Sequence, residues 1–378
     1  MKRKTYLGKR LEILVVFICI YSEIFLITNM SERQWRRIKR YFDADPRRRF
    51  RLEGFHGRGG QGSVYKVKYV RPGTSSDTAR ALVLKIADPE RSSDVQGLRR
   101  EKEILMRLQG CKHIVRCRVG PEDPLAPAEE ELGWAWVYLD QIENGTLIGF
   151  MQRLKEATLM RLPNRMLWTM FLCMIRSCIA MAWPRDEEDV NESTRRTPSR
   201  PTGLSHNDVH GGNIMFGSFM DHPEHTRTPI LKLLDFGIAG RINVNDGEET
   251  GEQRNILDMG IMMATLIGMQ TDRKYTGEEM EVDLSTLNRG EAVLSPASNL
   301  LEDVDMGTPD PFPQVNLQLR LIVAACMASD PNDRPSLAEL ENWILSGASG
   351  GASNYNNVRF ERDTTIQTIV QRFIFDAS

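Results

Sequence analysis

The sequence predicts an α+β fold in two lobes, because its strand-like segments come first and its helical segments follow. Stretches rich in Val, Leu and Tyr, separated by turns that carry Gly and Pro, indicate strands at Phe50–Phe55, Val64–Val70 and Ala81–Ala87. Apolar residues then recur mainly at helical spacing, and one further strand is expected at Trp134–Leu139. A small sheet should therefore belong to the first lobe and most helices to the second.

The composition is that of a soluble globular protein, with 378 residues of which 41% are hydrophobic and 26% are charged. The net charge of −2 gives no reason to expect a nucleic-acid partner. The six cysteines form no C-x-x-C pair and have no His/Cys spacing suited to zinc. We therefore expect a reducing, cytoplasmic environment.

The first thirty residues allow two interpretations. Basic residues precede an apolar run, Leu11–Ile27, which is short for a membrane span of ~20 apolar residues. It is either a membrane anchor or a dispensable extension that precedes an internal start at Met30. No small-residue cleavage site follows it, which argues against a secretory signal. As an anchor, residues 11–27 would contact the membrane and leave the remainder cytosolic, because more Lys and Arg follow the run than precede it. A basic segment, residues 31–49, comes next.

Several helices are predicted beyond the first strands. One runs from about Asp94 to Gln109, with Ser93 and Gln96 at capping-box spacing. Another, Asn164–Trp183, is ended by Pro184 and interrupted by polar residues, which favours a buried core helix over a membrane span. Further helices are expected at 255–269, 314–328 and 336–345. Residues 120–131 are expected to form a loop, 184–203 a mobile polar insertion, and 346–378 a tail with an amphipathic stretch near Thr364–Phe375.

Three glycines between the first two strands have the spacing G-x-G-x-x-G: Gly57, Gly59 and Gly62. Glycine lets a backbone turn sharply and approach phosphates closely. A strand follows the motif, whereas the dinucleotide-binding motif opens a helix. The alternatives are a phosphate-covering loop and a glycine-rich hairpin turn without a ligand.

A lysine and a glutamate are predicted to form a buried pair. Lys85 lies in an apolar strand, where its ammonium group either reaches water or meets an acid. Glu101 shares the apolar face of the following helix with Leu98 and Leu105. A carboxylate on a buried face is costly unless it is paired, and Lys85 is the obvious partner.

Two later segments complete a recognisable series. His206-Asn207-Asp208-Val209-His210-Gly211-Gly212-Asn213 precedes an apolar triplet, and Asp235-Phe236-Gly237 follows the apolar stretch 231–234. They resemble the catalytic loop and the D-F-G motif of protein kinases. With the glycine loop, Lys85 and Glu101 in the same order, residues 50–345 resemble a divergent eukaryotic-type protein kinase. This resemblance implies a bilobal fold: an N-lobe (50–140) of a small antiparallel sheet with one helix, and a larger, mainly helical C-lobe (144–345).

The resemblance implies roles for particular residues. Asp208 would accept the hydroxyl proton beside His210, and Lys85 and Glu101 would orient the ATP phosphates. Asn213 and Asp235 would hold Mg²⁺. Leu139 would be the gatekeeper, and the segment Asp140 to Ile142 would bind adenine through its backbone. Besides the three glycines, the residues in contact with ATP would be Val64, Lys85, Leu139, Asp140 and Ile142.

The sequence departs from this family in three ways. Asn207 replaces the arginine that binds a phosphorylated activation loop. Regulation by phosphorylation of that loop is therefore not expected. His210 stands where serine/threonine kinases have a lysine, and a neutral imidazole stabilises developing charge less well. Fewer than twenty residues separate Gly237 from the next helix, and no Ala-Pro-Glu follows. Arg334 resembles the family's scaffold arginine, which usually pairs with the glutamate of Ala-Pro-Glu. In this sequence it lacks that partner.

Two structural roles stay open at this point. Glu248, Glu249 and Glu252 are the possible substitutes for the glutamate that Arg334 lacks. Either Asn255 or Asp258 would brace the catalytic loop.

The function expected is ATP- and Mg²⁺-dependent transfer of the γ-phosphate to a serine or threonine hydroxyl of an unidentified protein. The alternatives are a pseudokinase that acts as a nucleotide-binding interaction module, and a small-molecule kinase of the same fold.

Overall fold

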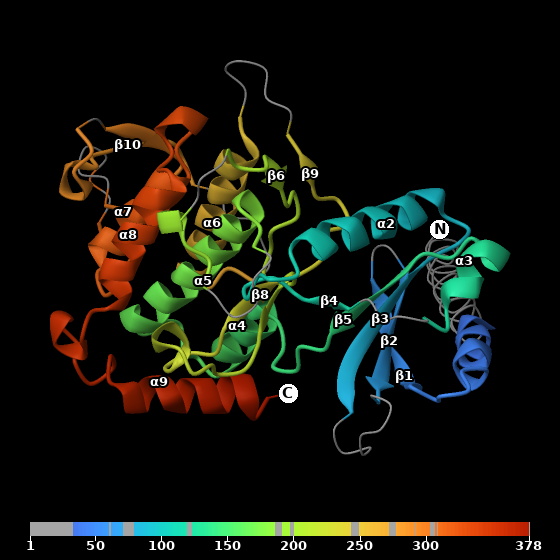
Figure 1. The fold of residues 1–378 in the computed structure, drawn as a ribbon. Coiled ribbons are helices and arrows are strands. Elements are labelled where there is room, and N and C mark those ends of the chain that lie inside the picture. The colour runs from blue at the N-terminus through green and yellow to red at the C-terminus, as the bar shows by residue number, and fades with distance from the viewer. Residues whose placement is uncertain are drawn as a thin grey trace, which may run out of the picture. The chain divides into compact units, whose positions relative to one another are not determined.

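The computed structural model describes residues 33–59, 62–70, 79–118, 123–185, 191–196, 200–242, 249–271, 277–290, 292–302, 307 and 309–377 (Figure 1). The apolar run 11–27 lies outside the described residues. The protein has a mixed α+β fold, as the sequence predicts. The chain divides into two compact units: the first comprises Met1–Arg99 and Arg118–Gln141, and the second Arg100–Cys117 and Ile142–Ser378.

The first unit is built on a five-stranded sheet with the order β1-β2-β3-β5-β4. All four strands expected from the sequence are present, with bounds that differ by a few residues: β1 Phe50–Gly59, β2 Gly62–Tyr69, β3 Arg80–Ala87 and β5 Trp136–Asp140. Each is antiparallel to its neighbour in the order β1-β2-β3-β5. The short β4, Cys117–Arg118, lies at the edge next to β5.

One face of this sheet is covered by two helices and forms a core of aromatic and branched side chains. The helix of residues 33–43 contributes Ile38 and Phe42, and helix α3, Ala126–Leu132, contributes Ala128. The expected loop at 120–131 is therefore wrong for its second half. Pro127 stands in the first turn of α3, where proline is well tolerated. Gly133, with φ 64°, ends the helix in the left-handed conformation.

Helix α2, Ser92–Arg107, confirms the predicted apolar stripe. Leu98, Glu101 and Leu105 are fully buried on one face, while Arg99 and Glu103 are exposed. The predicted capping box is wrong, because the helix begins at Ser92 and Ser93 already lies in its first turn. The Ser93 hydroxyl instead donates to Asp94 Oδ1 over 3.2 Å.

The second unit is organised around helix α5, Asn164–Ala182, of which every residue is buried. By length and composition it is the one described helix that could cross a membrane, yet it is wholly enclosed, which confirms the predicted core helix. It contacts α6 (Gly251–Ile267), α8 (Leu337–Ala348) and strand β8 (Leu231–Leu233), as Figure 1 shows. Helix α7, Leu317–Cys326, packs against α6 and α8. Helix α6 begins four residues before its predicted start, at a capping box made by Thr250 and Gln253.

Short antiparallel strand pairs complete the second unit. Strand β6 (Leu204–Ser205) pairs with β9 (Gly240–Arg241), and β7 (Ile214–Phe216) pairs with β8. A third pair joins β10 (Met280–Val282) to β11 (Val293–Ser295). The first two pairs frame the segments that carry the predicted catalytic residues.

A buried arginine on α5 is surrounded by acceptors. Arg176 contacts Glu224 at 2.8 Å and Glu341 at 2.5 Å, and it also donates to the main-chain oxygen of Glu192. Burial opposes ionisation of Glu341, but hydrogen bonds from Thr194 and Arg176 outweigh it and lower the pKa of this carboxyl. The cation and its two carboxylates therefore form one interdependent group inside the unit.

The described part of the insertion 184–203 is anchored. Glu192 is fully buried, and Thr194 donates to the Glu341 carboxylate through its main-chain N–H at 2.8 Å and its hydroxyl at 2.5 Å. The expectation of a mobile insertion is therefore wrong for residues 191–196. The polar composition of this segment gave no indication that the side chain of Glu192 is buried.

The C-terminal residues also pack on the second unit. Helix α9, Asp363–Val370, and the π-helical turn Gln371–Phe375 coincide with the predicted amphipathic stretch and bury Ile366 and Ile374. The turn contacts helix α4, Leu147–Glu156.

Glu361 takes the role of a helix cap for α5. Its carboxylate accepts hydrogen bonds from the main-chain N–H groups of Asn164 at 2.8 Å and Arg165 at 3.0 Å. These are donors without partners inside the helix, and an acid at this end also meets the positive pole of the helix dipole.

We predict that Arg176→Met lowers the free energy of unfolding by about 3–5 kcal/mol, because two largely buried carboxylates lose their cation. Arg227→Met is the matched control, since Arg227 makes only a partly exposed ion pair with Asp363 and should cost less than about 1 kcal/mol. Urea unfolding measures both. Equal costs for the two variants would contradict the prediction.

Candidate functional site

The register of the first unit's sheet aligns three of the residues predicted to serve ATP and phosphate binding, Val64, Lys85 and Leu139. Val64 on β2 lies directly opposite Lys85 on β3, and Lys85 lies opposite Val137 on β5. The neighbouring row on the same face contains Val83 and Leu139. Directly opposed residues of antiparallel strands point to the same side of a sheet, so these side chains share one face. It is the face opposite the core, whose rows contain Tyr65 and Leu84.

The predicted glycine loop is the hairpin between β1 and β2, in which Gly57 pairs with Val64 and Gly59 with Gly62. Gly62 has φ +148°, and a Cβ atom there would lie 2.0 Å from the carbonyl oxygen of Ile86. No other residue fits at this point. Gly57 and Gly59 have open space around them. Gly60 and Gln61 lie outside the described residues.

The end of β5 has a bound acid. The Asp140 carboxylate accepts two hydrogen bonds from Arg118, at 2.8 and 2.6 Å. The Asp140 side chain is thus bound to Arg118 on the edge strand. Only the backbone of Asp140 is left for the predicted adenine contact. Gln141 N–H donates to Ala81 O at 3.3 Å, and Ile142 begins the next part of the second unit.

Lys85 and Glu101 are both withdrawn from solvent, with relative exposures of 7% and 0%. Lys85 belongs to the first unit and Glu101 to the second. Their pairing stays a prediction.

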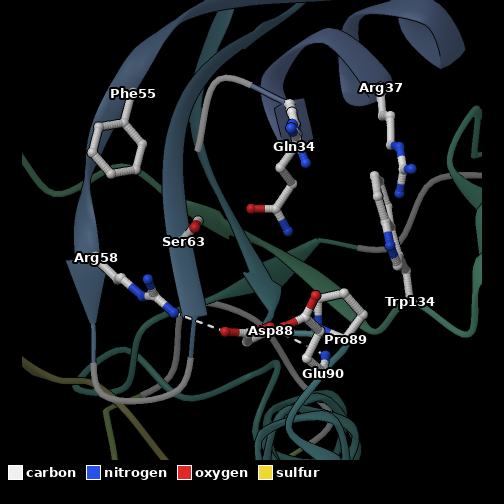
Figure 2. Close-up of a pocket in the computed structure, with 10 residues that line it drawn as sticks. Gln34, Arg37, Phe55, Arg58, Ser63, Asp88, Pro89, Glu90 and Trp134 are labelled. Atoms are coloured by element: carbon white, nitrogen blue, oxygen red, sulfur yellow. Dashed lines mark hydrogen bonds and ion pairs between the residues drawn. The ribbon is translucent and has the colours of Figure 1, made fainter. Parts of the chain in front are cut away.

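Figure 2 shows a pocket of about 180 Å³ in the first unit, on the same side of the sheet as Ser63 and Trp134. Arg58, from the glycine loop, contacts Asp88 in it at 2.7 Å. The pocket also takes Gln34 and Arg37 from the first helix. None of the residues predicted to contact ATP lines it.

The second unit brings the segment 206–213 and the segment 235–237 together. Asn213 lies five residues after Asp208 and folds back onto it: its Nδ2 donates to the main-chain oxygen at 2.9 Å and to carboxylate Oδ2 at 3.1 Å. The main-chain oxygen of Asn213 accepts from Leu234 N–H at 2.9 Å. Asp208, in the first segment, and Asp235, which follows Leu234, are therefore held in one local framework.

His206, which the sequence analysis assigned no role, connects these segments. Its Nδ1 accepts from Asp208 N–H at 3.2 Å and its Nε2 donates to Leu234 O at 2.8 Å, which requires a neutral ring. Burial lowers the pKa of His206, in agreement with this tautomer. The ring of Phe236 packs edge-on against it, with centroids 4.7 Å apart.

Two of the residues beside the site have left-handed backbones, Asn207 with φ 64° and Asp235 with φ 61°. Asn207 is held by Ser205 Oγ, which donates to Oδ1 at 2.6 Å, and its Nδ2 donates to Ile238 O at 3.2 Å. Such conformations are tolerated best by Asn and Asp among residues with side chains, and they persist where neighbours hold them.

His210 lies next to Asp208, with Nε2 3.8 Å from carboxylate Oδ2. Its Nδ1 accepts from Gly212 N–H at 3.0 Å, which places the ring proton on Nε2 in the neutral form. Both Asp208 and His210 are well exposed, with side-chain exposures of 44% and 56%. A substrate group can reach them.

The structure answers the two questions left open above. Asn255 braces the loop: its Oδ1 accepts from His206 N–H at 2.9 Å and its Nδ2 donates to Leu204 O at 2.8 Å. Asp258 instead pairs with Arg254 at 3.4 Å. Arg334 bonds to Glu249 and not to Glu252, whereas Glu248 lies outside the described residues.

The donors present suit a hard divalent cation. Asn213 Oδ1 accepts no hydrogen bond from the described part of the chain, since the amide nitrogen makes both contacts to Asp208. Carboxylate and amide oxygens are the protein ligands that Mg²⁺ prefers. Asp235 and Asn213 therefore fit the group that the sequence predicts for them.

No protein-family model and no curated protein sequence matches this chain.

We predict that His206 makes folding depend on pH. Its pKa is lower in the folded protein than the ordinary value of 6.5, so its contribution to stability is complete above pH 6.5 and is lost as the pH falls towards the folded value. The facing groups are the carboxylates Asp208 and Asp235, which favour the charged ring, and His210, which opposes it. The effect of burial on the pKa of His206 is larger than that of these groups.

The test compares His206→Gln, whose amide can still donate to Leu234 O, with the wild type. The stability difference between the two should shrink below pH 6.5 by up to about 1.4 kcal/mol per pH unit. Urea titrations from pH 5 to 8 measure it, with exposed His210→Gln as control. Parallel pH curves for wild type and His206→Gln would refute the prediction.

Proposed function

We propose that this chain is an ATP- and Mg²⁺-dependent phosphotransferase of the protein-kinase type, which transfers the γ-phosphate to a serine or threonine hydroxyl of a protein. The observation that carries the proposal is the framework around His206, which joins Asp208, Asn213 and the strand end before Asp235. A base and two oxygen donors for a metal ion, held in one unit, are what positioned phosphoryl transfer requires.

Asp208 acts as the base or positions the attacking hydroxyl. Its carboxylate is exposed, and Asn213 holds Oδ2 through a hydrogen bond of 3.1 Å, so its orientation is fixed before a substrate arrives. A candidate base needs access and geometry first, and Asp208 has both. His210, 3.8 Å from the same oxygen, offers an Nε2–H donor towards the transferring phosphate.

Asn213 Oδ1 and the Asp235 carboxylate hold the magnesium ion. The ion supplies charge neutralisation for the phosphates. The left-handed backbone of Asp235 and the Gly237 N–H that faces its Oδ1 at 3.4 Å direct the carboxylate for that purpose.

The first unit supplies residues for the nucleotide. The row Val64, Lys85 and Val137, with Leu139 beside it, combines an apolar surface for adenine with one cation for phosphate. Gly62 keeps the β1–β2 hairpin close to β3, because only glycine fits there. In this proposal the two units correspond to the N-lobe and the C-lobe of a bilobal kinase-like fold, with Lys85 paired to Glu101.

A second candidate is a kinase of the same fold that acts on a small molecule. The observation that favours it is the short connection after Gly237: only residues 238–250 precede α6. That leaves little chain for a surface that docks a peptide. Both candidates use the same chemical residues and differ in the acceptor.

We predict that Asp208→Ala reduces phosphate transfer from radiolabelled ATP to a generic protein by about 10²–10⁴-fold, because the base is lost. Asp43→Ala is the matched control, since Asp43 is an exposed aspartate of the first helix. Labelled protein in the wild type and control alone would support the proposal. Labelling of small molecules instead would favour the second candidate. ATP binding without any transfer would indicate a pseudokinase.

We also predict that Asp235→Asn removes the Mg²⁺-dependent part of the thermal stabilisation by ATP, because one charged metal ligand is lost. Asp43→Asn should keep the full shift. Thermal unfolding with ATP, with and without Mg²⁺, measures this. An unchanged Mg²⁺-dependent shift in Asp235→Asn would show that the metal assignment is wrong.

A further inference from the structure

A second cluster of chemically active side chains lies inside the second unit, apart from the residues discussed above. His113, Cys173 and His225 are all buried, and one ligand atom from each lies within 4.8 Å of the others. They come from three distant segments: the stretch after α2, the middle of α5, and the turn Pro223–His225. Their spacing in the sequence gave no sign of this association.

The cluster contains polar atoms that lack partners. Nε2 of His113 and Nε2 of His225 are buried and make no hydrogen bond with any residue that the structure describes. Cys173 Sγ lies 3.9 Å from His225 Nδ1, a long contact for a thiol. A buried polar atom without a partner costs about 1–3 kcal/mol, so two in one cluster require an explanation.

Complete burial excludes one explanation. His113 is 0% exposed, Cys173 2% and His225 1%, so no substrate reaches the thiol as a nucleophile. What can be enclosed in such a place is an ion. Thiolate sulphur and imidazole nitrogen are the ligands that zinc prefers in proteins.

The orientation of His113 matches that of a metal ligand. Its Nδ1 contacts Glu192 Oε2 at 2.7 Å, and its main-chain N–H donates to Glu192 Oε1 at 3.0 Å. A carboxylate that holds one ring nitrogen turns the other nitrogen towards the metal, the arrangement that usually supports histidine ligands. Glu192 is fully buried and thus holds this ring firmly.

The charges of the surrounding groups favour a dication. A dication bound by the Cys173 thiolate, with the Glu192 carboxylate behind His113, gives a group with no net charge, which is what a dry interior tolerates. A monovalent copper ion would leave one negative charge. The ligand atoms of a tetrahedral zinc ion lie ~3.5 Å apart, whereas the three atoms here lie within 4.8 Å of one another. Side-chain rotations that shift these atoms by about 1 Å would bring them onto one ion.

We infer that the second unit binds one Zn²⁺ through His113 Nε2, Cys173 Sγ and His225, with Glu192 positioning His113. The ion joins the chain stretch after α2, helix α5 and the turn 223–225. His113 O also accepts from Leu233 N–H at 2.9 Å, at the end of β8 that leads to Asp235. The zinc therefore stabilises the base of the segment that carries Asp235.

The test uses the full chain, stripped of metal with a chelator under reducing conditions, supplied with Zn²⁺ alone and desalted. Elemental analysis should find one zinc per chain in the wild type and almost none in Cys173→Ala. Cys178→Ala is the matched control, a buried cysteine on the same helix that lies outside the cluster. It should retain its zinc. Glu192→Gln should weaken zinc affinity by about 10–100-fold.

Co²⁺ provides a second readout that does not depend on the folding of a variant. Wild-type protein loaded with Co²⁺ should show a near-ultraviolet thiolate-to-cobalt absorption and visible bands of tetrahedral cobalt, both removed by added Zn²⁺. The inference is overturned by a wild type that takes up no zinc, by a cobalt spectrum without the thiolate band, or by equal zinc loss in Cys178→Ala and Cys173→Ala.

Discussion

The complete burial of α5 is the constraint on which the second unit depends. A helix of 19 residues with no exposed position must be covered on every side, and the neighbouring elements α6, α8 and β8 supply that cover. Most of its side chains are apolar, so burial stabilises them. Among those that are not apolar, Arg165, Cys173 and Arg176 contact residues from far along the chain.

The polar partners of α5 also explain why the segments around the proposed catalytic residues are rigid. Strand β8 packs on α5 and ends at Leu233, whose main-chain N–H donates to His113 O. The next residue is Leu234. His206 and Asn255 then connect Leu234 to the segment of Asp208. The segments of Asp208 and Asp235 are thus connected through His206 and Asn255, which are buried and hydrogen-bonded, and this is how a site keeps its geometry without a ligand.

The sequence was sufficient where a feature depends on local periodicity. The strands, the apolar stripe of α2 with Glu101 on it, and the buried character of α5 follow from spacing alone, and the structure agrees with each. It was insufficient for contacts between distant segments. Glu192 and His113 lie 79 residues apart, and Glu192 is surrounded by polar residues that indicate only a surface loop. For the same reason the site's framework could be predicted only in part: Asn255 stayed one of two options, and His206 was passed over.

The cap that Glu361 places on α5 has a consequence for the order in which the protein can fold as it is made. All strands of the first sheet have been synthesised once residue 140 has been added. The first turn of α5, by contrast, must wait for a side chain 197 positions further along. Loop closure over such a separation is slow, and domains generally fold as units during synthesis. The nascent chain therefore carries a long apolar helix whose first turn is uncapped until Glu361 has been synthesised, and apolar surface exposed in that interval favours aggregation.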